Sequence, residues 1–93
     1  MRIEVLYFAE FKDTAGKHKE VFQLNGGTVG HLINMLIEKY PSFRELLLEP
    51  NKQKIHSNIS IVINKSPLHD PNPRLAKLSE GDTVAFLLPV SGG

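Results

Sequence analysis

The chain has 93 residues, of which 41% are hydrophobic and 23% are charged, a composition typical of one small globular domain. Its formal net charge of +1 is too balanced to indicate a nucleic-acid-binding or membrane-binding surface. The absence of cysteine excludes disulfides, a thiol nucleophile and zinc–thiolate sites, and it suits a reducing compartment. Because the sequence shows neither a secretory signal plan nor an apolar run of roughly 20 residues, we expect a cytoplasmic protein.

The first quarter of the chain predicts two strands. Residues 2–9 (RIEVLYFA) are rich in β-branched and aromatic side chains and contain no strand breaker. Residues 10–16 predict a short helical turn that ends at a glycine, a favoured residue after a helix. Residues 18–24 predict the second strand, and the Asn-Gly-Gly sequence at 25–27 predicts a turn.

A long amphipathic helix is predicted over residues 28–40. Thr28 is a natural N-cap, and Pro41 ends the helix because the residue before a proline is pushed out of the helical region. The apolar residues recur at helical spacing: Val29, Leu32, Ile33, Leu36, Ile37 and Tyr40.

The second half predicts another short helix and two more strands. Ser42 and Glu45 have the spacing of a capping box, which predicts a helix over residues 42–49. Residues 58–64 and 83–89 predict strands. The intervening segments predict a polar loop at 51–57, a proline-rich loop with at most a two- or three-residue strand at 65–74, and a tight turn at 78–82.

This order of elements predicts an α+β fold. One helix cannot cover both faces of a sheet, but it can cover one face of a single mixed sheet of four or five strands. The pattern best matches the β-grasp, or ubiquitin-like, fold. The first and last strands are largely apolar, so we expect them to be adjacent and parallel at the centre of the sheet.

Alternation along the strands predicts two different faces. The face toward the long helix carries Ile3, Val5, Tyr7, Ile59, Ile61, Ile63, Val84, Phe86 and Leu88. The opposite face carries Leu6, Phe8, Val62, Ala85 and Leu87. No predicted element covers this second apolar face, so we interpret it as a partner surface. Two alternatives are that a loop folds over it, or that the assignment of faces is wrong by one residue.

No side-chain pattern indicates catalysis or metal binding. The four histidines, at positions 18, 31, 56 and 69, form no metal-ligand motif, and no serine has a nucleophile context. The sequence NGGTVG at 25–30 lacks the lysine and hydroxyl ending of a phosphate-binding loop. We therefore expect no metal and no cofactor bound by this chain.

The final residues, Gly92 and Gly93, are the remaining candidate for chemistry. A carboxylate on glycine can extend through a narrow tunnel and crowds neither a nucleotide nor an attacking group. Fully extended, residues 90–93 reach about 13–14 Å beyond the sheet, and Pro89 stiffens the base of this stretch. We expect one domain spanning residues 1–93, with a flexible tail from about residue 89.

The sequence resembles the MoaD/ThiS family of sulfur carriers. The resemblance covers the whole order of elements. It is carried by EVLYFAEF near the start, VINKSPL in the middle and EGDTVAFLLPVSGG at the end. Many family members have two prolines before the valine of the last motif, whereas here Leu88 takes the place of the first.

The resemblance implies a function for the carboxylate of Gly93. An ATP-dependent adenylating enzyme would activate it, and a sulfurtransferase would convert it to a thiocarboxylate. The chain would then act as the small subunit of molybdopterin synthase, a heterotetramer in this family, and donate sulfur to cyclic pyranopterin monophosphate in molybdenum cofactor biosynthesis. The resemblance implies that partners contact Phe8 and Leu87, which the alternation also places on the uncovered face. We therefore expect a partner-binding surface that comprises Leu6, Phe8, Val62 and Leu87 and the tail residues Pro89, Val90 and Ser91. The resemblance implies neither nucleic acid nor membrane as a partner.

Three other functions are compatible with the sequence. A carrier of the thiamin pathway uses the same chemistry but is usually shorter. A ubiquitin-like modifier would join Gly93 to a lysine of a target protein. A plain β-grasp binding module would need no reactive C-terminus. The sequence does not distinguish a molybdenum from a tungsten pathway, since both use the same pterin.

Overall fold

The computed structural model describes residues 1–88, so the predicted tail at 89–93 lies outside the described residues. The elements follow one another along the chain as β1 (Arg2–Leu6), α1 (Ala9–Ala15), β2 (Lys19–Gln23), α2 (Val29–Lys39), α3 (Phe43–Leu47), β3 (Ser60–Ile63), β4 (Ser66–Pro67), the 3₁₀ helix η1 (Pro73–Leu75) and β5 (Thr83–Leu87). The two-residue β4 confirms the short strand allowed for in the proline-rich loop.

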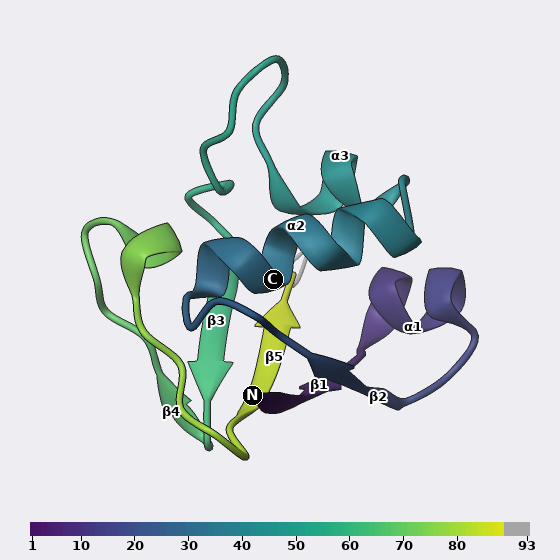
Figure 1. Ribbon diagram of the computed structural model, residues 1–93. Coiled ribbons are helices and arrows are strands. Elements are labelled where there is room, and N and C mark those ends of the chain that lie inside the picture. The colour runs from purple at the N-terminus through teal and green to yellow at the C-terminus, as the bar shows by residue number, and fades with distance from the viewer. Residues whose placement is uncertain (89–93) are drawn as a thin grey trace.

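The five strands form one mixed sheet in the order β2-β1-β5-β3-β4. The central pair, β1 and β5, is parallel, with Glu4 opposite Thr83 and Leu6 opposite Ala85. The other neighbours are antiparallel. Figure 1 shows α2 crossing one face of this sheet. The predicted α+β, β-grasp architecture and its central parallel pair are confirmed.

The core lies between the sheet and the helices. In α2 the apolar stripe is fully buried at Val29, Leu32, Ile33 and Leu36, whereas its last two members are only partly buried. Helices α1 and α3 add the rings of Phe11 and Phe43, whose centroids are 5.0 Å apart in an edge-to-face pair. Because these helices all bury their apolar side chains in the same core, the other face of the sheet is left to the strands alone.

Two of the three predicted helix caps are confirmed. Thr28 Oγ1 accepts a hydrogen bond from the backbone N–H of His31, and Gly16 adopts the left-handed conformation (φ 74°) after α1. The capping box at Ser42 is wrong: its side chain makes no capping bond, because backbone carbonyls of the preceding turn already accept the first N–H groups of α3. Phe43 N donates to Tyr40 O, and Arg44 N donates to Pro41 O.

The first strand and the loop at 51–57 differ from the sequence prediction. Strand β1 ends at Leu6, three residues early; the chain is still extended at Phe8, and the left-handed Ala9 (φ 50°) then turns it into α1. Ile55, expected in a polar loop, is 6% exposed and belongs to the core, where it pairs with Leu48 in an isolated β-bridge. One apolar residue in a polar segment has no periodicity to reveal its burial.

Candidate functional site

The face of the sheet opposite the helices carries an open groove of about 690 Å³. Four of the sequence-predicted partner residues line it together: Leu6, Phe8, Val62 and Leu87. We call it the outer groove; its other lining residues are Glu4, Asn64, Lys65, Thr83 and Ala85. The predicted residues Pro89, Val90, Ser91, Gly92 and Gly93 lie outside the described residues.

Strand register explains why these side chains meet. Ala85 in β5 lies opposite Leu6 in β1 on one side and Val62 in β3 on the other, so the three form one row across the centre of the sheet. Leu87 lies two residues further along β5, on the same face. Residues far apart in the sequence therefore build one apolar surface.

Burial confirms the assignment of faces. Ile3, Val5 and Val84 on the helix side are fully buried, whereas Phe8 on the other side is 48% exposed. A shift by one residue would have reversed this pattern. Ala85 departs from the expectation: it is 7% exposed, because its methyl group lies low between the longer side chains of Leu6 and Val62.

The outer groove is polar at one end and apolar at the other. Glu4 is opposite Thr83, and the backbone N–H of Asn64 donates to Thr83 O, so these residues share the row beside Leu6 and Val62. The Asn64 side chain is fixed by donating to Asp82 Oδ1 (2.8 Å) and accepting from Thr83 N (2.9 Å). Phe8 and Leu87 lie at the opposite end, where β5 finishes.

Sequence reasoning missed the polar end of the outer groove. The alternation that places Leu6 and Leu87 on this face also places Glu4 and Thr83 there. The alternation thus predicts the polar end of the groove once polar residues are included. The sequence pattern predicts a strand end at Asn64 and a loop at Lys65. Both adopt left-handed conformations (φ 52° and 70°) and form the two-residue turn of the β3–β4 hairpin.

Residues 1–88 contain no group of three or more His, Asp or Glu side chains that could hold a metal ion. Within the same residues no helix has the length and apolar character needed to cross a bilayer. Three of the histidines are exposed and His56 is partly buried. The described residues form a surface that is polar at one end and apolar at the other, and such a surface is suited to contact another macromolecule.

Comparisons with known proteins agree with this architecture. A family model described as the ThiS family matches residues 5–93. The molybdopterin synthase sulfur carrier subunit of Mycobacterium tuberculosis is 30% identical over 95 residues, which covers 100% of this chain and 99% of that protein.

Solved structures show the same fold. SAMP1 from Haloferax volcanii superposes with a TM-score of 0.84 at 22% identity, covering 100% of both chains. Small archaeal modifier protein 1 from Methanosarcina acetivorans gives a TM-score of 0.83 at 27% identity, with coverage of 99% of this chain and 96% of that one. Because the family model spans nearly the whole chain and the sheet has the expected strand order, this chain belongs to the ThiS/MoaD family of small sulfur carriers.

Proposed function

We propose that this chain is the sulfur-carrying small subunit of a molybdopterin synthase. The observation that carries the proposal is the full-length similarity to the molybdopterin synthase sulfur carrier subunit of Mycobacterium tuberculosis. The outer groove supports it, because its apolar end lies where β5 leads toward the Gly-Gly sequence.

In this proposal the reactive group is the carboxylate of Gly93. On a separate adenylating enzyme, a carboxylate oxygen attacks the α-phosphorus of ATP, which forms an acyl adenylate and releases pyrophosphate. Sulfur at the sulfide level, delivered by a sulfurtransferase, then attacks the acyl carbon and AMP leaves, so that one carboxylate oxygen is replaced by sulfur. ATP binds the adenylating enzyme, and this chain contributes only its terminus and its docking surface.

The large subunit of the synthase is the second partner. It receives the thiocarboxylate, which transfers its sulfur to cyclic pyranopterin monophosphate, and water restores the carboxylate of Gly93. Both partners have to hold the same end of the chain in turn. We therefore assign Leu6, Phe8, Val62 and Leu87 to a surface that the two partners share, continued by Pro89, Val90 and Ser91.

Mass spectrometry tests this function directly. The full chain is incubated with an adenylating enzyme, ATP and a sulfur donor, and intact mass is measured with and without ATP. We expect an ATP-dependent replacement of one oxygen by sulfur, located in the peptide that ends at Gly93. Adding the large subunit and the pterin precursor should then convert the precursor and restore the original mass. Sulfur elsewhere in the chain, or an unchanged mass, contradicts the proposal.

A second candidate is a protein modifier. It is favoured by the 27% identity to small archaeal modifier protein 1 from Methanosarcina acetivorans over almost the full length of both chains. A modifier would join Gly93 to a lysine side chain of a target. Tryptic digestion would then yield branched peptides that carry residues 78–93 on a target lysine. Such peptides, found without pterin conversion, would favour the modifier over the synthase subunit.

A further inference from the structure

A second pocket, of about 580 Å³, lies on the side of the molecule that carries β4 and η1. It is bounded by the loop after α3, by β3 and by the loop that leads into η1, and we call it the basic-rimmed pocket. Its floor consists of aliphatic side chains: Ile55, Ile59, Ile61 and Leu68. Its volume falls in the range of ordinary ligand pockets, about 300–1,000 Å³. None of its lining residues lines the outer groove.

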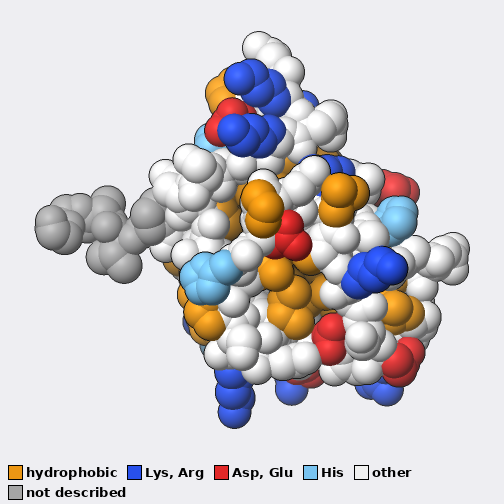
Figure 2. Space-filling model, turned by 90° about the vertical axis from the view of Figure 1, so that its left-hand side faces the viewer, with side chains coloured by type: hydrophobic (Ala, Val, Ile, Leu, Met, Phe, Trp, Pro, Cys, Tyr) orange, Lys and Arg blue, Asp and Glu red, His pale blue; other side chains and the backbone are white. Residues whose placement is uncertain are grey.

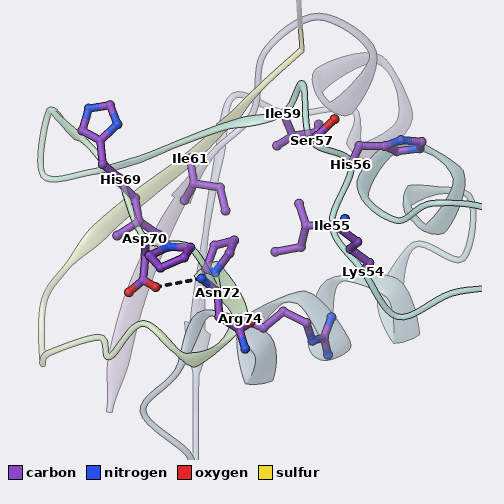
Figure 3. A pocket seen from close by; sticks show the side chains of 13 residues that line it. Lys54, Ile55, His56, Ser57, Ile59, Ile61, His69, Asp70, Asn72 and Arg74 are labelled. Atoms are coloured by element: carbon purple, nitrogen blue, oxygen red, sulfur yellow. Dashed lines mark hydrogen bonds between the residues drawn. The ribbon is translucent and has the colours of Figure 1, made fainter.

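The rim of this pocket carries more positive than negative charge. Figure 3 shows Lys54 and His56 on one side, His69 and Asp70 on the other, and Arg74 along the lower edge between them. Asp70 is the one acidic residue among the described residues that line the pocket, and its Oδ1 accepts a 2.9 Å hydrogen bond from the backbone N–H of Asn72. Figure 2 shows this side of the molecule: hydrophobic side chains gather near its middle together with acidic ones, and histidine, lysine, arginine and further acidic side chains lie around them. The pocket thus combines an apolar floor with a cationic rim.

Arg74 is held in place and retains an unused donor. Its Nη2 donates a 3.1 Å hydrogen bond to Asn34 Oδ1 of α2, which fixes the guanidinium group at the pocket. Its Nη1 atom is buried and has no hydrogen-bond partner among the described residues. A ligand cannot reach this buried atom, but no carboxylate among the described residues pairs with the guanidinium group, so its positive charge is left for an acidic ligand to balance.

We propose that the basic-rimmed pocket binds an acidic segment of a partner protein. One aliphatic side chain of that segment fills the floor, and flanking carboxylates pair with Lys54 and Arg74, whose planar guanidinium group suits a carboxylate. Among the described residues that line the pocket none is Phe, Tyr or Trp, so it offers no aromatic platform for a nucleobase. Strand addition at the neighbouring edge is disfavoured, because Pro67 of β4 has no N–H to donate.

The consequence is a second point of attachment. Because the basic-rimmed pocket and the outer groove have no lining residue in common, an acidic segment can stay bound while another surface of a partner engages the groove. Holding a partner at two points raises its effective concentration at the groove. The basic-rimmed pocket consists of described residues only and does not depend on the chemistry of Gly93. The proposal of a peptide ligand can therefore be tested separately from the proposed synthase function.

Nuclear magnetic resonance of the full chain with short peptides tests the proposal. The probe is an acetylated Glu-Asp-Ile-Asp-Glu peptide, and the controls are Gln-Asn-Ile-Asn-Gln, Glu-Asp-Gly-Asp-Glu and inorganic phosphate. We expect saturable shifts confined to residues 54–61 and 68–74. Both control peptides should bind at least about tenfold more weakly, since each lacks the charges or the apolar anchor.

Charge reversal at the rim provides the matched variants. Lys54→Glu changes an exposed rim residue and should weaken binding of the acidic peptide at least about tenfold. Lys12→Glu makes the same change at an exposed position of α1 outside the pocket and should leave the affinity unchanged. Unperturbed amide spectra establish that both variants are folded.

Several results would overturn the proposal. These are the absence of saturable shifts, shifts that map to the outer groove, equal affinity for the neutral peptide, and full binding by Lys54→Glu. Phosphate that produces the same shifts with the affinity of the acidic peptide would identify a small-anion site and would equally reject a peptide ligand.

Discussion

The hydroxyl group of Tyr40 donates a 2.7 Å hydrogen bond to Oε1 of Glu20, which ties the end of α2 to the edge strand β2. The same oxygen accepts a 2.9 Å bond from the Tyr7 hydroxyl, and Lys39 pairs with the other carboxylate oxygen. Burial raises the pKa of Glu20, but the hydrogen bonds from Lys39, Tyr40 and Tyr7 outweigh it and lower the pKa to about 2.

This lowered pKa predicts acid sensitivity of the fold. Because the folded-state pKa lies below the ordinary value of 4.5, the ionised Glu20 stabilises the fold above about pH 4.5, and this contribution is lost as the pH falls toward 2. Glu20→Gln should therefore lower the free energy of unfolding at pH 7 by on the order of 2 kcal/mol and flatten its decline below pH 5. Urea unfolding from pH 7 to pH 2 measures both effects. An identical decline in the variant would show that Glu20 does not cause it.

Thr28 precedes α2 and Ser42 precedes α3, and we expect their substitution by alanine to lower the free energy of unfolding by unequal amounts. Thr28→Ala removes the side chain that accepts from His31 N and should lower the free energy of unfolding by about 1 kcal/mol. Ser42→Ala, at a position where no capping bond is made, should change it by less than about 0.5 kcal/mol. Chemical denaturation of the two variants side by side checks the difference. Equal losses would mean that Ser42 caps α3 in solution.

Charge introduced into the outer groove should impair partner binding and spare the fold. Phe8→Glu changes a groove residue that is 48% exposed, so the unfolding free energy should shift only by about 0.5 kcal/mol. Affinity for the adenylating enzyme and for the synthase large subunit should fall by at least about tenfold, because apolar anchors dominate such interfaces.

Val21→Glu is the matched control for this change. Val21 is 43% exposed and opposite Glu4 in the strand register, so it shares the outer face of the sheet, but it does not line the groove. Its two partner affinities should remain near those of the unmodified chain. Equal weakening by both variants would argue for a general effect of charge on this face.

The left-handed conformation of Ala9 predicts a stabilising substitution. A side chain at φ 50° carries a steric cost that glycine avoids, so Ala9→Gly should raise the free energy of unfolding by up to about 1 kcal/mol. Ala15→Gly, at the helical end of α1, should lower it by at least about 0.5 kcal/mol. Thermal unfolding distinguishes the two, and a loss of stability in Ala9→Gly would contradict the prediction.

The features that the sequence predicted correctly are those with a local period. The apolar stripe of α2 and the alternation that exposes Leu6, Val62 and Leu87 are readable without knowledge of the fold. The Glu20 network was not predictable in this way, because Glu20 meets Tyr7 and Tyr40 only after β2 and α2 have packed. Arg74 likewise acquires its partner Asn34 from a distant helix, 40 residues away in the sequence.

Strand β5 occupies the middle of the sheet, yet it is the last of the five strands to leave the ribosome. Its partner β1 is among the first segments made, and Glu4 and Thr83 are 79 residues apart. Until Thr83–Leu87 emerges, the inner edges of β1 and β3 have no neighbour, and such edges invite pairing with other chains. The central parallel pair therefore delays completion of the sheet until β5 has been made, and until then the open edges of β1 and β3 are a site for aggregation.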